Sequence, residues 1–246
     1  MKHQGHILAF DKGRFGMGQL GPLVHMSPKN FFEACAASLF IGRRHELETD
    51  ERFGQFLPYI ILRRIAPDGL VSLFEYQRTS KVGEDRLGGK KSVGVGGHVD
   101  LIDVRIDDNS VIDFVATTAH AIAREMNEEI LFTLDPQDPV ESITVTYDEA
   151  RYGKAKNGDG GEFEFQRDSL VPKFHGVIND MSDAVGRVHF GCVFTIDLPA
   201  WLEPKCRESE LITIGMRPVA DILGDDLENW SRLIVNEIGF LGDNKA

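Results

Sequence analysis

The sequence predicts an α/β sandwich. Two strand-like runs, 56–65 and 70–78, are joined by a turn signal. A helical pattern of apolar residues extends from Val111 to about Leu131, and helix-like segments close the chain. Strands that flank a central helix, with helices at the end, indicate this fold class rather than a helical bundle or an all-β barrel. The 246 residues, 42% of them hydrophobic, suffice for one such domain with an extension.

Residues 1–50 differ in composition from the rest of the chain. They are rich in Gly, His and Phe, and they contain one amphipathic patch at 29–41. We therefore expect an N-terminal extension of residues 1–50, with a short helix, packed on a domain of residues 51–246.

The first two strands of the domain are expected to form a hairpin, because the residues Ala-Pro-Asp-Gly at 66–69 favour a tight turn. The run 92–104, which is interrupted by glycines, is predicted to be a strand. The charged, Gly-rich run 148–168 is predicted to be an exposed loop. The remaining apolar runs are assigned by length and periodicity. They are strands at 142–147, 171–180, 186–198 and 211–216, and helices at 219–223 and 227–239.

The central helix has apolar residues at spacings of three and four, which place them on one stripe. The stripe consists of Val115, Ala119, Ile122, Met126 and Ile130. The preceding residues 107–110, Asp-Asp-Asn-Ser, are all candidates for the N-cap. Packing of this stripe would hold the opposite, acidic face of the helix rigidly beside a sheet.

Three carboxylates crowd the end of this helix, in the run REMNEE at 124–129. Glu125 precedes Glu128 by three residues and Glu129 by four, so the side chains share a face, with Cβ atoms about 5–6 Å apart. Hard oxygen ligands at this spacing suit Mg²⁺ or Mn²⁺. These three glutamates are therefore the candidate metal ligands and catalytic residues. The alternative is a solvated acidic face in which Arg124 forms an internal salt bridge.

A glycine-rich segment with a basic flank precedes the helix. Gly96 and Gly97 allow a close backbone approach or a positive φ. Arg86, Lys90 and Lys91 are cations available for phosphate. We take these five residues as candidate substrate-binding residues. A tight turn with solvated lysines is the alternative.

His98 and His189 have different expected roles. His98 follows the double glycine, and it is expected either to bind substrate or to be a hydrogen-bonded strand residue. His189 lies with Cys192 in an apolar strand, where a position in the core is expected for both.

The order of double glycine, helix and R-E-x-x-E-E resembles the Nudix signature. The longer spacing from glycine to arginine implies an insertion, expected at 101–113. Ala116 stands in place of the upstream glutamate of the signature, and Asp100 or Asp103 could substitute for it. Leu131 stands in place of its last glycine, so the helix is expected to run on. The matching residues are Gly97, Arg124, Glu125, Met126, Glu128 and Glu129.

The runs 83–98 and 185–194 are also similar to a group of uncharacterised Nudix-type phosphoesterases, over roughly residues 50–240. The resemblance implies an α/β/α sandwich with a mixed sheet and dependence on a divalent metal. It also implies attack of water on a phosphorus atom of a nucleoside-diphosphate-linked compound. The expected protein is thus a diphosphatase, and its partner is a small phosphorylated substrate.

Two other functions stay open. An enzyme like isopentenyl-diphosphate isomerase shares the fold and a similar Gly-Gly-His sequence. Isomerisation would need a cysteine near the diphosphate, and none lies in 56–100. A non-catalytic, nucleotide-sensing Nudix domain would be marked by loss of the carboxylates, which this chain retains.

The composition of the chain limits the ligands and the cellular compartment that we expect for this protein. The net charge of −12 disfavours a nucleic-acid duplex as ligand. Cys35, Cys192 and Cys206 have long spacings without a zinc-type pair, as expected for free thiols in a reducing compartment. No apolar run is long enough for a signal peptide or a membrane span. We expect a cytoplasmic protein with no membrane partner, and a homodimer is left open.

Overall fold

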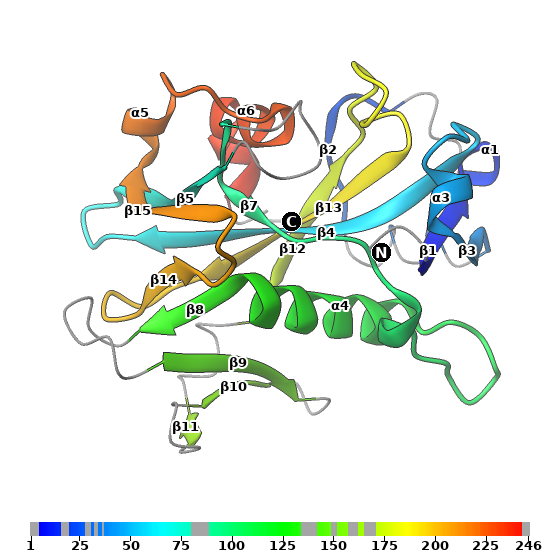
Figure 1. The fold of residues 1–246 in the computed structure, drawn as a ribbon, viewed down its shortest axis with the longest axis horizontal. Helices are drawn as coiled ribbons and strands as arrows, with labels where there is room; N and C mark the ends of the chain where they lie inside the picture. Colours follow the sequence, from blue (N-terminus) through cyan, green and yellow to red (C-terminus); the bar gives the residue numbers. More distant parts are fainter. Residues whose placement is uncertain are drawn as a thin grey trace. The chain divides into compact units, whose positions relative to one another are not determined.

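The computed structural model describes residues 5–15, 20–27, 31, 34–35, 37–79, 89–133, 142–148, 152–156, 162–164 and 171–242. The chain divides into two compact units. Unit 1 comprises Met1–Tyr59, Gly96–Ile122 and Phe174–Phe194, and unit 2 comprises Ile60–Val95, Ala123–Lys173 and Thr195–Ala246. Four elements contribute residues to both units: the strands β4 (Phe53–Ile65), β12 (Lys173–Ile178) and β13 (His189–Asp197) and the helix α4 (Phe114–Glu129) (Figure 1).

Unit 1 is built on antiparallel strand pairs. β1 (His6–Asp11) pairs with β3 (Leu39–Arg43) and with the first residues of β4. β2 (Leu23–His25) pairs with β12 (Lys173–Ile178), which lies beside β13. Short helical elements of this unit include α1 (Lys12–Phe15), α3 (Arg44–Leu47) and the 3₁₀ turn η3 (Leu101–Asp103).

Aromatic side chains fill the core of unit 1. Phe10, Phe31, Phe56 and Phe190 are all buried. The ring centroids of Phe10 and Phe56 lie 4.6 Å apart, and those of Phe31 and Phe56 lie 6.2 Å apart. Tilted and edge-on pairs at such distances are favourable. Since Phe31 belongs to the amphipathic patch 29–41, this part of the N-terminal region contributes to the core.

The first 50 residues contain strands as well as helix. Of the patch 29–41, the described residues Phe31, Ala34 and Cys35 are helical, as predicted, whereas Leu39 begins β3. The consecutive buried residues 7–10 of β1 show why this strand was missed: both of its faces are covered, so its sequence lacks polar alternation. The boundary between an extension 1–50 and a domain 51–246 stays a prediction.

Unit 2 contains strands of two sheets. In the first, β5 (Val71–Arg78) lies between β15 (Leu211–Pro218) and the end of β4, while β6 (Lys91–Ser92) and β7 (Gly94–Val95) pair with β5 and β4. The second sheet has the order β11-β10-β9-β8-β14. Its strands are β8 (Ile130–Thr133), β9 (Ser142–Asp148), β10 (Tyr152–Lys156), β11 (Glu162–Glu164) and β14 (Glu203–Cys206).

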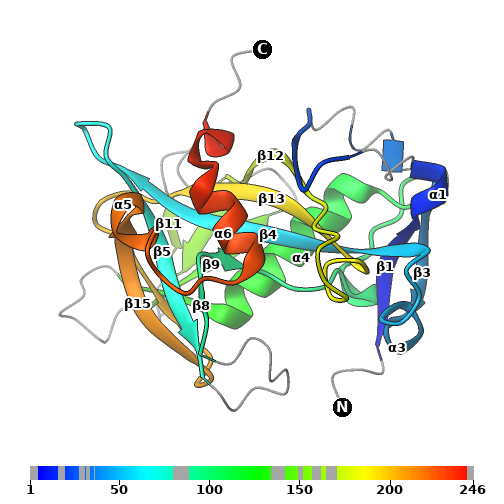
Figure 2. The same cartoon turned by 90° about the horizontal axis from the view of Figure 1, so that it is seen from above.

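The C-terminal helices of unit 2 are α5 (Val219–Ile222), α6 (Asn229–Asn236) and the 3₁₀ turn η4 (Ile238–Leu241). Figure 2 shows α6 crossing over β4, with β5 to one side of it. Ser231 anchors it there, because its Oγ accepts a hydrogen bond from the backbone N–H of Val93 at 3.0 Å and lies 3.1 Å from Ser92 Oγ. None of the described helices combines the length and apolar character needed to cross a bilayer.

The predicted α/β class with a mixed sheet is confirmed. The hairpin is confirmed as well, with Gly69 at φ +85° and its N–H bonded to Ala66 O.

The predicted exposed loop at 148–168 is wrong, because it contains β10 and β11. β10 pairs along its length with β9, and backbone pairing outweighs the loop-like composition. The run 92–104 is also not one strand, since it ends in η3, and β14 was not predicted.

The start and end of the central helix differ from the prediction. Asp113, rather than a residue of 107–110, precedes α4 and accepts a hydrogen bond from the N–H of Ala116 at 3.0 Å. Asp107 instead closes a turn, accepting from the N–H groups of Asn109 and Val111. The helix does not run on, because β8 begins at Ile130.

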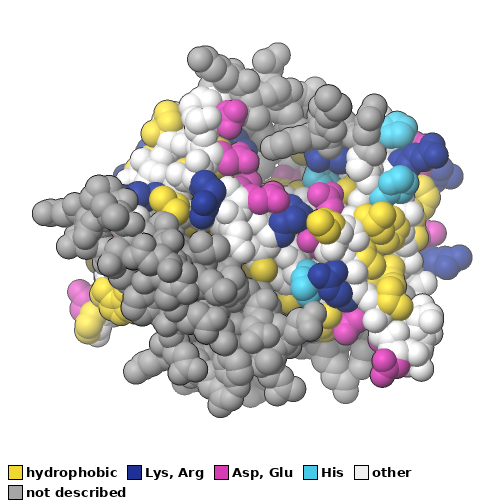
Figure 3. Space-filling view, turned by 60° about the horizontal axis from the view of Figure 1, so that its bottom comes forward, with side chains coloured by type: hydrophobic (Ala, Val, Ile, Leu, Met, Phe, Trp, Pro, Cys, Tyr) yellow, Lys and Arg dark blue, Asp and Glu magenta, His cyan; other side chains and the backbone are white. Residues whose placement is uncertain are grey.

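The segment expected as an insertion, 101–113, consists of η3 and this turn. It exposes apolar side chains, and the predicted stripe is wrong at Val115, which is 55% exposed. Hydrophobic side chains gather on the face drawn in Figure 3. The large exposed hydrophobic residues in and beside the segment are Leu101, Ile102, Ile106, Val111 and Val115.

Candidate functional site

One carboxylate of α4 lies on the buried side of the helix. Glu125 is 7% exposed, next to the buried Met126 and one turn after the buried Ile122. Its position therefore continues the stripe of buried residues, which is not where a solvated charge would lie. Because a buried charge is destabilising unless it is paired or bound to a metal, Glu125 needs a cationic partner.

Arg124 provides that partner in the structure. Its Nη1 lies 2.7 Å from Glu125 Oε1 and 3.3 Å from Glu128 Oε2. Glu128 is the outermost of the three, with 56% of its side chain exposed. Two carboxylate oxygens therefore converge on one cationic nitrogen. The structure thus contains both the clustered carboxylates expected of a metal site and the salt bridge of Arg124 expected of a solvated acidic face.

Glu129 ends the helix and lies in a different electrostatic environment. Its carbonyl accepts a hydrogen bond from the N–H of Arg207 at 2.7 Å, and its Oε2 is buried. Tyr76 raises the pKa of the neighbouring Arg78 above its usual range, and Glu228 and Glu129 add to this effect. Arg78 is held by Glu228, with 2.7 Å between Nε and Oε1. A permanent cation is thus fixed near Glu129.

The carboxylates of α4 suit a hard divalent cation in chemistry, since all their donors are oxygens. Among the described residues, no group of three or more His, Cys, Asp and Glu side chains has the geometry of a metal site as it stands. The convergence of Glu125 and Glu128 on Arg124 Nη1 nevertheless marks a point where a cation is stabilised. The residues therefore fit Mg²⁺ or Mn²⁺, provided that their side chains reorient.

The close backbone approach predicted at the double glycine is present at Gly96. This residue has φ +148°, and a Cβ atom there would lie 1.9 Å from the carbonyl oxygen of Pro58. Only glycine fits this position. The N–H of Val99 bonds to Phe56 O at 3.3 Å, which holds the following residues, Gly97 and His98, beside the first half of β4.

His98 takes part in a hydrogen-bonded group. Its Nε2 lies 2.9 Å from Gln55 Oε1 and 3.2 Å from His189 Nε2. His189 is half-buried rather than in the core, so its prediction is wrong, whereas Cys192 is buried as expected. Neither Gln55 nor His189 was a candidate, because residues far apart in sequence carry no signal of their proximity. Contact of His98 with substrate stays a prediction.

The predicted phosphate-binding cations have carboxylate partners in unit 2. Lys91 Nζ lies 2.8 Å from Asp225 and 3.7 Å from Glu75, and Lys90 Nζ lies 4.0 Å from Asp226. Arg86 falls outside the described residues. Lys91 is thus part of an internal network, and its role in binding substrate remains a prediction.

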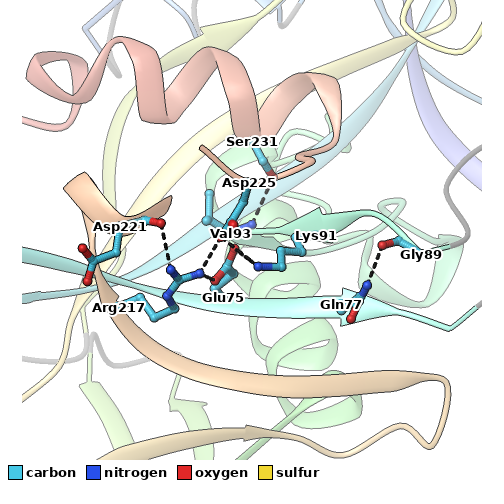
Figure 4. A network of polar contacts seen from close by, with 9 residues as sticks. All are labelled: Glu75, Gln77, Gly89, Lys91, Val93, Arg217, Asp221, Asp225 and Ser231. Atoms are coloured by element: carbon cyan, nitrogen blue, oxygen red, sulfur yellow. Dashed lines mark hydrogen bonds and ion pairs between the residues drawn. The ribbon is translucent and has the colours of Figure 1, made fainter. Parts of the chain in front are cut away.

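The network centres on Glu75, whose side chain is fully buried (Figure 4). Arg217 Nη1 donates to Glu75 Oε2 at 2.5 Å and also to Asp225, and its Nη2 donates to Asp221 O at 2.8 Å. These bonds join β5, β15, the residue Lys91 of β6 and the segment after α5. The network therefore fixes the C-terminal part of unit 2 on its sheet.

The Arg217→Met variant is expected to lose about 2–3 kcal/mol of unfolding free energy, because it leaves a buried carboxylate short of its main cation. Urea denaturation measures this loss. The matched control is Arg43→Met, which removes an exposed pair with Glu46 and should cost less than about 1 kcal/mol. Equal losses in the two variants would contradict a stabilising role of the network.

The network also predicts a dependence of stability on pH. Hydrogen bonding to Lys91 holds the pKa of Asp225 at about 2, below its ordinary 3.8. A lowered pKa stabilises the fold above pH 3.8, and this contribution is lost as the pH falls towards about 2. The wild type should therefore lose more stability across this window than Asp225→Asn. If the urea midpoint of unfolding falls equally with pH in both proteins, the Asp225 carboxylate contributes nothing to the pH dependence of stability.

Known proteins similar to this chain include one relative in sequence and one in structure. No family model matches the chain. It is 26% identical over 198 residues to Protein YmaB of Bacillus subtilis (strain 168), covering 79% of this chain and 75% of YmaB. The structure is similar to that of Tm1382, which is classed with the Nudix hydrolases, with a TM-score of 0.63, 18% identity and coverage of 96% and 99% of the two chains.

A more distant match is the NUDIX hydrolase from Alicyclobacillus acidocaldarius, with a TM-score of 0.44, 13% identity and coverage of 74% of this chain and 90% of that protein. The likeness to Tm1382 extends over nearly the whole of both chains. The chain therefore has the Nudix fold.

Proposed function

We propose that this protein is a hydrolase that depends on Mg²⁺ or Mn²⁺ and cleaves a diphosphate linkage in a small, nucleoside-diphosphate-type substrate. The observation that carries the proposal is the placement of Glu125 on the buried stripe of α4, with its carboxylate converging with that of Glu128. A solvated charge run would not bury a carboxylate. The Nudix fold supports the same function.

Glu125, Glu128 and Glu129 would hold the cation. When bound, the cation supplies positive charge that stabilises the charge developing on phosphate oxygens. Arg124 orients two of these carboxylates, and Arg78 adds a fixed positive charge near the third. These residues therefore supply both the ligands and part of the electrostatic field that a diphosphate requires.

The reaction would proceed by direct attack of water on phosphorus. The oxygen of water forms the new P–O bond, the bridging P–O bond breaks, and the leaving phosphate oxygen keeps the electron pair. A carboxylate at the end of α4 accepts the proton of the attacking water. No covalent intermediate is needed, since the sequence contains no signature of a covalent nucleophile.

The isomerase-like alternative requires a reactive cysteine. Burial raises the pKa of Cys192 well above its usual value, and it also raises the pKa of Cys35 and Cys206. Raised pKa values keep these thiols protonated at neutral pH. A protonated thiol can donate a proton, but the sequence has no cysteine in 56–100, where the isomerase-like alternative requires one. Hydrolysis therefore fits better.

The setting in which we propose this activity is cytoplasmic. The proposal takes residues 51–246 as the catalytic domain and residues 1–50 as an extension packed on it. Nucleotide sugars, dinucleotides, noncanonical triphosphates and capped nucleotides are the substrate classes to compare. A homodimer is compatible with the proposal but is not required by it.

A substrate panel tests the proposed function. Each class is incubated with Mg²⁺ or Mn²⁺ in ¹⁸O-labelled water, and the products are identified by mass spectrometry. We expect hydrolysis of a diphosphate linkage with the label in one phosphate-containing product. The nucleotide-sensing alternative predicts binding of a panel member without turnover. A trapped phosphoryl- or nucleotidyl-enzyme would contradict direct attack by water.

A further inference from the structure

Three side chains from separate parts of unit 1 meet at one point. Gln55 comes from β4, His98 from the loop after β7, and His189 from the start of β13. His98 Nε2 lies 2.9 Å from Gln55 Oε1 and 3.2 Å from His189 Nε2. The two rings are inclined at 66°, so the imidazoles meet through their nitrogens rather than by stacking.

The hydrogen bonds of the group fix where its protons lie. His189 Nδ1 lies 2.8 Å from the carbonyl oxygen of Val185, so Nδ1 carries the hydrogen and Nε2 of the neutral ring presents a lone pair. His98 Nε2 faces this lone pair and Gln55 Oε1, both acceptors. A single N–H on His98 therefore lies between these two acceptors, and three electron-donor atoms converge on the position of that one proton.

We propose that Gln55, His98 and His189 form a binding site for a divalent transition-metal ion such as Zn²⁺ or Co²⁺, which would replace this proton. Imidazole nitrogens bind such ions at about 2.0–2.1 Å, so two of them in tetrahedral geometry lie about 3.3 Å apart. The observed separation of 3.2 Å matches this value without movement of the backbone. The Gln55 Oε1 atom supplies a third donor.

The surroundings hold the donors in place. Gln55 N–H bonds to Val188 O at 2.9 Å, which fixes the backbone of Gln55 next to that of His189. The bond from His189 Nδ1 to Val185 O orients the ring, as second-shell carbonyls do for metal-binding histidines. Both histidines are half-buried, so solvent and an ion can reach them.

Gln55 itself is unusual for a strand residue. It is fully buried, and its amide Nε2 has no hydrogen-bond partner among the described residues. An unsatisfied buried amide costs about 1–3 kcal/mol. Binding of an ion by the Gln55 Oε1 atom would explain why a glutamine, rather than an apolar residue, occupies this buried position. Because the donors are two imidazoles and an amide, the site would prefer ions such as Zn²⁺ and Co²⁺ to Mg²⁺, unlike the carboxylates of α4.

A Co²⁺ titration tests the proposal independently of the enzymatic activity. Chelator-treated protein is titrated with Co²⁺ in excess Mg²⁺, which competes for the carboxylates of α4. We expect one Co²⁺ with the visible absorption of nitrogen ligation, displaced by Zn²⁺. His98→Gln and His189→Gln should each weaken binding at least about 100-fold, because each removes a direct ligand. The exposed His45→Gln is the matched control and should bind as the wild type does.

A second measurement needs no variant to fold. In protein labelled with ¹⁵N at histidine, Zn²⁺ should shift the Nε2 resonances of His98 and His189 and preserve the Nδ1–H of His189. Unchanged Nε2 resonances, or wild-type Co²⁺ affinity in both histidine variants, would overturn the proposal. The Glu128→Gln/Glu129→Gln double variant should retain this site, so the test stands even if the proposed hydrolase activity fails.

Discussion

The Glu129→Gln variant is expected to hydrolyse its diphosphate substrate about 100- to 1,000-fold more slowly than the wild type, with a smaller change in KM. The amide keeps the size of the side chain, but it cannot accept the proton of the attacking water or provide a charged ligand. Both interactions strengthen as charge develops in the transition state, so their loss falls mainly on kcat. Steady-state kinetics with the substrate found in the panel measures the effect.

The control for this variant is Glu46→Gln, which neutralises an exposed glutamate of α3 and should leave kcat unchanged. Circular dichroism must show that Glu129→Gln is folded, because the end of α4 adjoins β8. A folded Glu129→Gln with wild-type kcat would remove this residue from the reaction, whatever its role in the fold.

The Gly96→Ala variant is expected to lose more than about 4 kcal/mol of unfolding free energy, or to fail to fold. Its Cβ atom would lie 1.9 Å from the carbonyl oxygen of Pro58, so a backbone segment of unit 1 must move. The strain of φ +148° adds to this loss, since residues with a side chain rarely adopt it. Urea or thermal denaturation measures the change.

Gly69→Ala separates the two causes. Gly69 also has a positive φ, +85°, but no atom lies within 4 Å of its Cβ position. Its loss should be limited to about 1 kcal/mol of conformational strain. Comparable losses at the two glycines would show that the close approach at Pro58 is not what requires Gly96.

Local sequence signals predicted the parts of the fold that depend on local chemistry. The turn at 66–69 and the apolar residues Ile122 and Met126 are examples, because turn residues and helical periodicity act within a few positions. The signals failed where a distant partner decides the structure. β10 forms on β9 despite its loop-like composition, and Asp113 caps α4 although residues 107–110 offer four candidate caps.

In the candidate site, too, the sequence predicted features that depend on neighbouring residues and missed those that depend on distant ones. The spacing of Glu125, Glu128 and Glu129 is local, and the sequence was sufficient to single them out. The sequence did not predict that Lys91 lies between Glu75 and Asp225, because pairing across elements depends on the tertiary fold. The meeting of Gln55, His98 and His189 escaped prediction for the same reason.

Isothermal titration calorimetry with Mg²⁺ tests the central claim, that the carboxylates of α4 bind a hard divalent cation, most directly. The wild type is compared with the Glu128→Gln/Glu129→Gln double variant, and Glu46→Gln serves as the charge control. We expect saturable binding to the wild type and to the control, and binding at least about 10-fold weaker, or lost, in a folded double variant. The same Mg²⁺ affinity in all three proteins would contradict the claim.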